Sequence, residues 1–496
     1  MSEKKEPSLL QAFIPVIFLI LLLSVNVGLF GDEALGGSNQ IVLILSAAVA
    51  ALVAIQIGHK WIDLREGIVK SISSAMSSML ILLMIGSLAG TWLLSGVVPA
   101  MIYYGLQVLS PKIFLFAACI VAAIVSIATG SSWTTAATVG IALIGIGRAL
   151  GIPEGMIAGA VLSGAYFGDK MSPLSDTTNL APAMAGTDLF THIRYMALTT
   201  VPSISVALVL FLLIGFTQDL ESTSTNISGI LTAISDKFYI SGILFVVPVI
   251  VVIMIIRKVP AIPALLVGTL LGSIFAMIFQ PELVKEVSSQ AAFNGKLYDT
   301  FVTSFPTATY MFIGTMQSLF GDIAISTSDD MVNELLSAGG MSGMLGTIWL
   351  ILSAMVFGGV MEKAGFLQRI AKMIISAVNS TASLVGSTVG TCIFFNITAS
   401  DQYLAIVVPG RMYAKIYEEK GLAPENLSRS LEDSGTVTSV LVPWNTCGAY
   451  HSSVLGVSTL VYAPYCFFNI LSPFMSIFFA AAGIKIKKLV TDNFSK

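Results

Sequence analysis

Charge is scarce in this sequence. Only 11% of its 496 residues are charged, 55% are hydrophobic, and the mean hydropathy is +0.88. A chain of this length with so few charges cannot cover itself with a water-compatible surface, which excludes an ordinary soluble domain and indicates a membrane protein. No basic cluster is present, so the sequence offers no surface for nucleic acid.

Several catalytic and redox motifs are also missing. The four cysteines form no CxxC pair and lie in or beside apolar runs, so free thiols are expected. No HExxH or GxSxG sequence occurs in an apolar segment, which argues against an intramembrane enzyme. No Walker A sequence occurs, which argues against ATP-driven pumping. No cofactor is expected.

Long apolar runs are the most abundant feature of the chain, and each is long enough to cross about 30 Å of hydrocarbon. The clearest cover residues 10–30, 40–58, 76–97, 195–217, 238–256, 261–279, 345–361 and 454–484. The first run is longer than the apolar core of a signal peptide and lacks a small-residue cleavage site, so we expect it to be retained as a span. The lipid bilayer is therefore the first expected partner.

Matching residues recur at a nearly constant spacing in the two halves of the chain, which indicates an internal duplication. The pairs are Thr129 and Thr398, Pro153 and Pro424, Ser163 and Ser434, Pro173 and Pro443, and Gly186 and Gly456. We predict a first repeat over residues 1–220 and a second over residues 237–496, with an insertion near 284–342.

The positions of Lys and Arg predict the orientation. These residues gather, together with histidines, at 59–65, 192–194, 257–258, 363–372 and 485–488. The loops at 31–39 and 218–236 contain acidic residues and no Lys or Arg. By the positive-inside rule, both termini are expected in the cytoplasm, and the two repeats enter the membrane from opposite sides. This arrangement is an inverted-topology repeat.

Inversion requires an odd number of crossings in each repeat, so some apolar segments must return to the side from which they entered. Residues 113–150 and 381–418 each contain two short apolar runs around a polar tip, and we predict that each forms a re-entrant hairpin. Residues 301–320 are expected to be re-entrant or peripheral, because a crossing there would place residues 363–372 outside.

Two further segments, 156–186 and 426–452, are predicted to be broken helices. Pro173 and Pro443 interrupt them, and proline removes a backbone hydrogen bond. The expected fold is an all-α polytopic membrane protein with two inverted-topology repeats, about ten spans, two re-entrant hairpins and broken helices.

Polar side chains concentrate at the two predicted hairpin tips and the two helix breaks. Hydroxyl, carboxylate and freed carbonyl oxygens are the ligands with which a protein replaces the hydration shell of a hard cation such as Na⁺. In the first repeat, the candidate cation- or substrate-binding residues are Thr129, Ser131, Ser132, Asp169, Ser172, Ser175, Asp176, Thr177 and Asn179. In the second repeat they are Thr398, Ser400, Asp401, Asp433 and Asn445.

Among these residues, Asp169, Asp176 and Asp401 are assigned as the Na⁺ ligands. An ionised carboxylate at the membrane centre costs about 2.5–3.5 kcal/mol on insertion scales, so these groups must be paired, ion-bound or protonated. A carboxylate that holds either a proton or Na⁺ couples the two fluxes. His451 is expected to be a buried histidine that is hydrogen-bonded for structure, and a proton carrier is the alternative. Arg411 would favour an anionic solute if it faced the site.

The chain resembles the NhaC family of Na⁺/H⁺ antiporters, within the ion transporter superfamily. The resemblance covers essentially the whole chain and rests on Gly130–Trp133 (GSSW), Gly168–Asn179 (GDKMSPLSDTTN) and Pro443–Gly448 (PWNTCG). It implies Na⁺ moving against H⁺ across a bacterial inner membrane, with a mobile transport domain beside a scaffold, which is an elevator-type mechanism. A homodimer is also expected. The alternative is Na⁺- or H⁺-coupled transport of a small carboxylate, as in a malate–lactate antiporter, or of an amino acid.

Overall fold

The computed structural model describes residues 6–489 except 31–33, 35, 109, 218–226, 291–294, 328–329 and 377. Parts of the two acidic loops, 31–39 and 218–236, therefore lie outside the described residues. Within the described chain the only strands are β1 (Ile323–Ala324) and β2 (Ser337–Ala338), which pair in antiparallel fashion. The predicted all-α fold class is confirmed.

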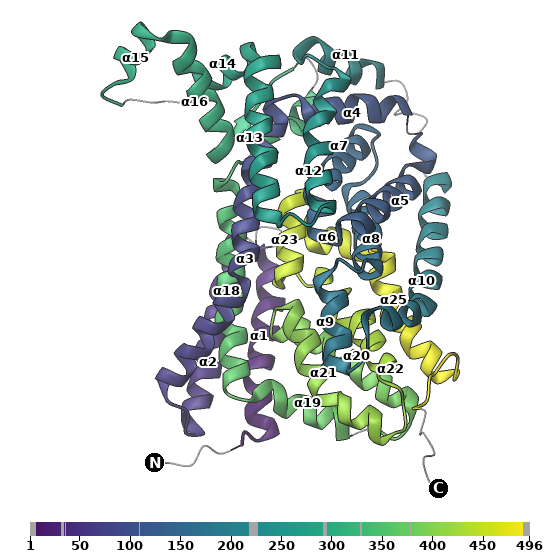
Figure 1. The fold of residues 1–496 in the computed structure, drawn as a ribbon. Helices are drawn as coiled ribbons and strands as arrows, with labels where there is room; N and C mark the ends of the chain where they lie inside the picture. Colours follow the sequence, from purple (N-terminus) through teal and green to yellow (C-terminus); the bar gives the residue numbers. More distant parts are fainter. Residues whose placement is uncertain are drawn as a thin grey trace.

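The first half of the chain supplies two sets of helices (Figure 1). The first set is α1 (Leu9–Phe30), α2 (Ser38–Gln56), α3 (Trp61–Leu94) and α4 (Val97–Val108). The second set is α5 (Pro111–Thr129), α6 (Ser132–Thr135), the π-helical turn η2 (Ala136–Gly140), α7 (Ile141–Ala149), α8 (Glu154–Met171), α9 (Asp176–Ala185) and α10 (Leu189–Thr217).

The second half begins with helices that pack on α4 and on one another, reaches α3 with α13, and continues through the insertion. These elements are α11 (Ile227–Lys237), η3 (Gly242–Phe245), α12 (Val246–Ile256), α13 (Ala261–Phe279), α14 (Pro281–Gln290), α15 (Tyr298–Ser304), α16 (Pro306–Phe320), α17 (Asp330–Leu335), η4 (Ser342–Met344) and α18 (Leu345–Lys363). The rest of the chain forms α19 (Phe366–Ser376), α20 (Thr381–Thr398), α21 (Gln402–Glu419), α22 (Pro424–Leu431), η5 (Glu432–Thr436), η6 (Ser439–Leu441), α23 (Thr446–Leu455), α24 (Thr459–Tyr462), η7 (Ala463–Tyr465) and α25 (Phe467–Ala481).

Helix packing divides these elements into two groups. Helices α1, α2, α3, α12, α13 and α18 pack mainly on one another, and we call them the scaffold group. Helices α5–α10 and α20–α25 form the second group, which contains both hairpins and both broken helices, and we call it the core group. The arms of hairpin α5–α7 extend from the centre of the molecule toward one end, and those of α20–α21 toward the other (Figure 1).

Eight helices of the described chain are long and apolar enough to cross a membrane, or up to ten if each of two bent helix pairs is one span. About ten spans were expected besides the two hairpins, whereas the hairpin arms α5 and α20 are themselves among these eight by length and composition. The expected span 454–484 is not one helix, since Thr459–Tyr465 and Phe467–Ala481 meet at a 55° bend. Pro464 cannot donate the backbone hydrogen bond that a continuous helix needs there.

Helix α3 is also longer than the predicted span 76–97, because it begins at Trp61 and has 34 residues. Residues 61–75 are partly charged and polar, but they contain no proline that would interrupt a helix. The helix can therefore begin at Trp61, ahead of the apolar span. The additional turns bring Ser74 onto the same helix as the apolar span, which already contains Ser77 and Ser78.

The N-terminal segment and α19 lie at the same end of the molecule, as Figure 1 shows. Lys372 Nζ lies 3.2 Å from Glu6 Oε1, and Arg369 Nε donates to the Pro7 carbonyl at 3.1 Å. Residues 363–372 therefore share a side with the N-terminus, as the expected topology requires. Residues 301–320 form α15 and α16 at the opposite end, and neither helix is among those long enough to cross a membrane.

Candidate functional site

Two adjoining cavities lie where the tip of hairpin α5–α7 and the break between α8 and α9 meet the scaffold group. Their volumes are about 250 Å³ and about 490 Å³. Ile81 and Ala261 of the scaffold group and Ser131, Thr134 and Asp176 of the core group line both cavities. A membrane protein tolerates non-helical backbone at membrane depth only where that backbone is buried in protein or lines a water-filled cavity, and these two cavities lie beside such a break.

Local sequence explains the hairpin tip. Gly130 ends α5 with φ +70°, a left-handed conformation that glycine adopts without steric cost. A Cβ atom at this position would lie 2.6 Å from Leu174 Cβ and 2.9 Å from Ser175 N, so the tip packs directly on the helix break. Ser131 then caps α6, its Oγ accepting a hydrogen bond from Thr134 N at 3.2 Å.

Asp169, in the last turn of α8, lines the smaller cavity and is only 5% exposed. Its Oδ2 accepts hydrogen bonds from the backbone N of Ser132 at 3.1 Å and from Ser132 Oγ at 2.7 Å. Its Oδ1 is buried and has no hydrogen-bond partner among the described residues. A buried carboxylate oxygen without a donor is costly in free energy, so this atom is suited to bind a cation or a proton.

Asp176 is the first residue of α9 and is exposed to both cavities. Its Oδ1 accepts from the backbone N of Thr177 at 2.9 Å, and its Oδ2 accepts from Tyr403 Oη of α21. The structure thus brings Asp169 and Asp176 to one cavity, and it joins the first helix break to the tip of the second hairpin.

Asp401 contributes differently. It is 3% exposed and caps α21, its Oδ1 accepting from the backbone N of Leu404 at 2.9 Å. Its neighbours Gln402 and Tyr403, and Thr446 after the second break, line the smaller cavity. Asp401 itself is not among the lining residues of either cavity, so the structure places it behind the site.

Asp433 is held in an ion pair instead of facing the cavities. Lys170 Nζ donates to Asp433 Oδ1, and both side chains are 0% exposed. Asp433 Oδ2 accepts from Thr199 Oγ1 at 2.7 Å and from Ser476 Oγ. Both carboxylate oxygens are therefore occupied, and Lys170 does not pair with its sequence neighbour Asp169.

The other predicted site residues divide into two sets. Thr129 and Ser131 line the larger cavity, while Ser132 holds Asp169. The side chains of the remaining residues make hydrogen bonds that hold the tips and breaks together: Ser172, Ser175, Thr177, Asn179, Thr398 and Asn445. The Ser400 carbonyl accepts from Thr446 N at 3.0 Å, and φ at Ser400 is +58°.

Sequence reasoning missed the scaffold side of the site. Ser74, Ser77 and Ser78 of α3 face Asp169 and Asp176 across the smaller cavity, and Lys258 lines the larger one. The paired serines within an apolar run were a visible signal in the sequence. Lys258 gave no such signal, because it lies in the short basic connection between α12 and α13.

Two residues considered in the sequence take other positions. Arg411 is an exposed residue of α21 and lines neither cavity. His451 is buried, and its ring packs edge-to-face against Tyr166 and Tyr450. The expected structural hydrogen bond is wrong, because neither ring nitrogen has a hydrogen-bond partner among the described residues.

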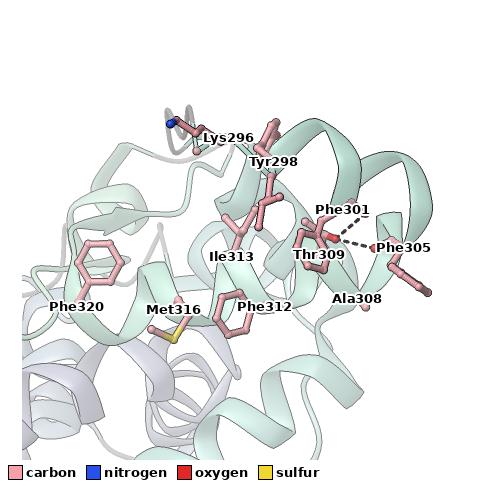
Figure 2. Close-up of a pocket in the computed structure, with 12 residues that line it drawn as sticks. Lys296, Tyr298, Phe301, Phe305, Ala308, Thr309, Phe312, Ile313, Met316 and Phe320 are labelled. Atoms are coloured by element: carbon pink, nitrogen blue, oxygen red, sulfur yellow. Dashed lines mark hydrogen bonds between the residues drawn. The ribbon is translucent and has the colours of Figure 1, made fainter.

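A larger cavity lies elsewhere, at α15 and α16, and has a volume of about 910 Å³. Figure 2 shows Phe301, Phe312 and Met316 around it. Among the residues that line this cavity, Lys296 is the one that carries a charge, and none is a carboxylate. It therefore lacks the hard oxygen ligands of the smaller cavities, and we do not assign it as the cation site.

A multi-pass membrane protein in which hairpin tips and broken helices converge on buried carboxylates belongs to the class of secondary transporters. Residues 164–484 match the profile of the Na⁺/H⁺ antiporter family, and the chain belongs to this family. Because the family consists of antiporters, the prediction that the chain is not an enzyme is confirmed.

Three relatives illustrate the family. The Na⁺/H⁺ antiporter NhaC of Alkalihalophilus pseudofirmus is 36% identical over 95% of this chain and 96% of its own length. The malate-2H⁺/Na⁺-lactate antiporter of Bacillus subtilis is 34% identical over 97% of this chain and 96% of its own length. The arginine/ornithine antiporter ArcD of Halobacterium salinarum is 33% identical over 98% of this chain and 94% of its own length.

Proposed function

We propose that the protein exchanges Na⁺ for H⁺ across the bacterial inner membrane and binds Na⁺ in the cavity shared by Asp169 and Asp176. The observation that carries this proposal is the partnerless Oδ1 of Asp169 beside a second carboxylate. Hydroxyls of Ser74, Ser77 and Ser78 on the opposite wall supply further hard oxygen ligands.

Coupling follows from the chemistry of one buried carboxylate. Either Na⁺ or a proton neutralises Asp169, and the two cannot use Oδ1 at once. Ser132 fixes the other oxygen, so the carboxylate stays oriented in both states. Protonation at low pH therefore removes the Na⁺ ligand, and Na⁺ at high pH displaces the proton. No cofactor takes part in this scheme, in which Na⁺ and H⁺ are the transported ions.

An elevator-type movement suits the placement of the cavity. One wall belongs to the scaffold group, through α3 and the start of α13, and the other to the core group, through the hairpin tips and helix breaks. If the core group slides along α3, Asp169 and Asp176 travel with it while the serines stay behind. The ion would then be exposed to each side of the membrane in turn.

The test uses purified protein in proteoliposomes with an imposed pH gradient. Na⁺ should dissipate the gradient in the wild type, and Asp169→Asn should raise the apparent KM for Na⁺ at least about tenfold, which is 1.4 kcal/mol of binding free energy. Asp188→Asn is the matched control, because Asp188 is an exposed aspartate after the same broken helix. Unchanged Na⁺ flux in Asp169→Asn would refute the site.

A second candidate function is the coupled transport of a small carboxylate or amino acid. It is favoured by the 490 Å³ cavity, which exceeds what Na⁺ needs, and by Lys258, which lines that cavity together with Asp176. Lys258 adopts φ +63°, an uncommon conformation for a residue with a side chain. An ammonium opposite a carboxylate can hold both charged groups of an amino acid or one carboxylate of a hydroxy acid.

Labelled malate, lactate, arginine and ornithine distinguish the two functions in the same proteoliposomes. Uptake driven by Na⁺ or H⁺, and reduced in Lys258→Gln but not in the adjacent control Arg257→Gln, would establish the second function. Its absence with intact Na⁺/H⁺ exchange would leave cation antiport alone.

Thiol labelling from each side of the membrane would test the cytoplasmic placement of both termini, and the mass of the protein in detergent would test the expected homodimer.

A further inference from the structure

Tyr403 is a cavity residue to which the proposed Na⁺ site assigns no role. It is the second residue of α21, and it lines the smaller cavity together with Asp169 and Asp176. Its Oη donates a hydrogen bond to Asp176 Oδ2, and the residue is 40% exposed. A tyrosine of the second repeat thus contacts a carboxylate of the first repeat in the cavity where the cation is proposed to bind.

The internal repeat gives Tyr403 the position that Thr134 has in the first half of the chain. The spacing that separates Thr129 from Thr398 also separates Thr134 from Tyr403. Thr134 follows the first hairpin tip, Tyr403 follows the second, and both line the smaller cavity. The two hairpin tips therefore contribute a hydroxyl-bearing residue to one cavity from equivalent positions.

The direction of its hydrogen bond determines what else the Tyr403 oxygen can do. A phenol has one O–H donor, and in Tyr403 this donor is committed to Asp176. The lone pairs of the oxygen can only accept, so toward a third group it acts as a hard oxygen ligand. The hydroxyl of Ser132 is in the same situation, because it donates to Asp169 Oδ2 at 2.7 Å. Each carboxylate of the cavity is thus paired with a hydroxyl whose oxygen can coordinate a cation.

Two other side chains at the second hairpin tip are engaged elsewhere. Gln402 lines the same cavity, but its amide nitrogen donates to the Thr436 carbonyl at 3.0 Å and its Oε1 accepts from Cys447 Sγ at 3.3 Å. Asp401 caps α21 and lines neither cavity. At this tip, Tyr403 is therefore the residue that connects the cavity with a carboxylate of the first repeat.

We propose that Tyr403 Oη is a ligand of the transported Na⁺ and sets the preference of the site between Na⁺ and the smaller Li⁺. This inference rests on the proposed Na⁺/H⁺ exchange and adds a neutral ligand from the second repeat to the site. Selectivity between cations depends on the number of coordinating oxygens and on their field strength. Because Li⁺ completes its shell with fewer oxygens than Na⁺, loss of one neutral oxygen should weaken Na⁺ binding more than Li⁺ binding.

Transport in proteoliposomes with an imposed pH gradient tests the assignment, with Na⁺ and Li⁺ as alternative cations. Tyr403→Phe keeps the ring and removes the oxygen, so it should raise the apparent KM for Na⁺ about fivefold and that for Li⁺ less. The value of kcat should stay nearly unchanged, because the lost contact serves binding.

Tyr413→Phe is the matched control for this experiment. Tyr413 lies on the same helix and lines neither cavity, and its Oη is hydrogen-bonded to Ser387 Oγ at 2.6 Å and to Thr391 Oγ1 at 2.9 Å. Loss of this hydroxyl should leave the KM for both cations unchanged.

A second variant, Tyr403→Trp, separates a cation ligand from a residue that only positions Asp176. The indole N–H can donate to a carboxylate but has no lone pair for a cation. Tyr403→Trp should therefore keep the raised KM for Na⁺, and it carries the same prediction if Tyr403→Phe does not fold.

Three results would overturn the assignment while leaving Na⁺/H⁺ exchange at Asp169 in place. They are an unchanged KM for Na⁺ in Tyr403→Phe, equal rises for Na⁺ and Li⁺, and a return to the wild-type KM for Na⁺ in Tyr403→Trp. If wild-type proteoliposomes showed no Na⁺-dependent loss of the pH gradient, the proposed exchange itself would fail, and this inference with it.

Discussion

Lys170 and Asp433 join the two repeats through a single ion pair in the interior of the core group. Lys170 belongs to α8 and Asp433 to η5, and hydroxyls from α10 and α25 occupy the second carboxylate oxygen. Because the pair is completely removed from solvent, its desolvation cost is large and must be offset by these hydrogen bonds. The pair therefore matters more for specifying the arrangement of the four helices than for net stability.

Removal of one partner of this pair should be far more damaging than removal of both. Lys170→Met leaves Asp433 buried without its counter-charge and should lower the free energy of unfolding by about 3–5 kcal/mol. Adding Asp433→Asn to that variant removes the orphaned charge and keeps an acceptor for Thr199, so part of the loss should be recovered. Thermal unfolding in detergent measures both. A double variant less stable than Lys170→Met would contradict the argument.

Outside the membrane-spanning helices, Lys487 gives a stability effect with a predictable pH range. Its hydrogen bond to the Glu425 carboxylate, at 2.5 Å, raises the pKa of Lys487 above its ordinary value. A basic group whose pKa is raised by folding contributes its full stabilisation at pH values below its ordinary pKa. That stabilisation is lost as the pH rises through the raised pKa. The stabilisation by Lys487 should thus be constant near neutral pH and disappear only at strongly alkaline pH.

Lys487→Gln measures this contribution. The side chain is 49% exposed, so the loss at neutral pH should be under about 1 kcal/mol. The gap in melting temperature between variant and wild type should stay constant across neutral pH and close at alkaline pH. A gap that widened with rising pH would show that another group is responsible.

At the scale of elements, the contact between hairpin tip and helix break determines the geometry of the site. Gly130 allows the tip of α5–α7 to touch Leu174 and Ser175, and Ser175 caps α9 through a hydrogen bond with Thr178 N at 3.3 Å. The second repeat repeats this design with other residues. Asn445 caps α23, and Thr446 N donates to the Ser400 carbonyl at the second tip.

Two glycine substitutions separate this packing contact from backbone strain. Gly130 and Gly186 both have φ in the left-handed region, +70° and +86°, so alanine at either position costs about 1–2 kcal/mol. Only at Gly130 would the new methyl group collide, since nothing lies within 4 Å of the corresponding position at Gly186. Gly130→Ala should therefore weaken Na⁺ exchange strongly and Gly186→Ala little. Equal transport in the two variants would show that the contact is dispensable.

At the scale of the whole molecule, the two helix groups meet along α3 and α18, and relative movement between them is the basis of the proposed mechanism. Ser453 of α23, in the core group, lies with its Oγ 3.2 Å from Met344 Sδ at the start of α18. Within the core group, Arg148 Nε of α7 lies 2.7 Å from Glu154 Oε1 of α8, and both side chains are partly exposed. The first contact crosses the groups and the second does not.

Cross-linking at these two contacts tests the movement. A short thiol cross-linker on Ser453→Cys/Met344→Cys should stop Na⁺ exchange, while the same treatment of the partly exposed pair Arg148→Cys/Glu154→Cys should leave it active. The four native cysteines are all buried, which keeps background reaction low. Full activity of the cross-linked Ser453/Met344 pair would exclude sliding of the core group at this contact.

Membrane class, an all-α fold and the positions of the polar interruptions were determined by the sequence itself. In hydrocarbon every backbone polar group needs an internal partner, so a stretch that combines proline, glycine and clustered polar side chains indicates a break in the helix beside a cavity. These signals are local, and for that reason Gly130, Pro173 and Asp169 could be identified from their neighbours along the chain.

Only the tertiary structure decided which partner each polar group has. Asp433 pairs with Lys170, Asp176 accepts from Tyr403, and the serines of α3 complete the cavity around Asp169. Such contacts join residues far apart in the chain and depend on how whole helices pack. Spacing and composition carry no information on that packing, since the same carboxylate is compatible with an ion pair, a helix cap or a cation site until its neighbours in space are fixed.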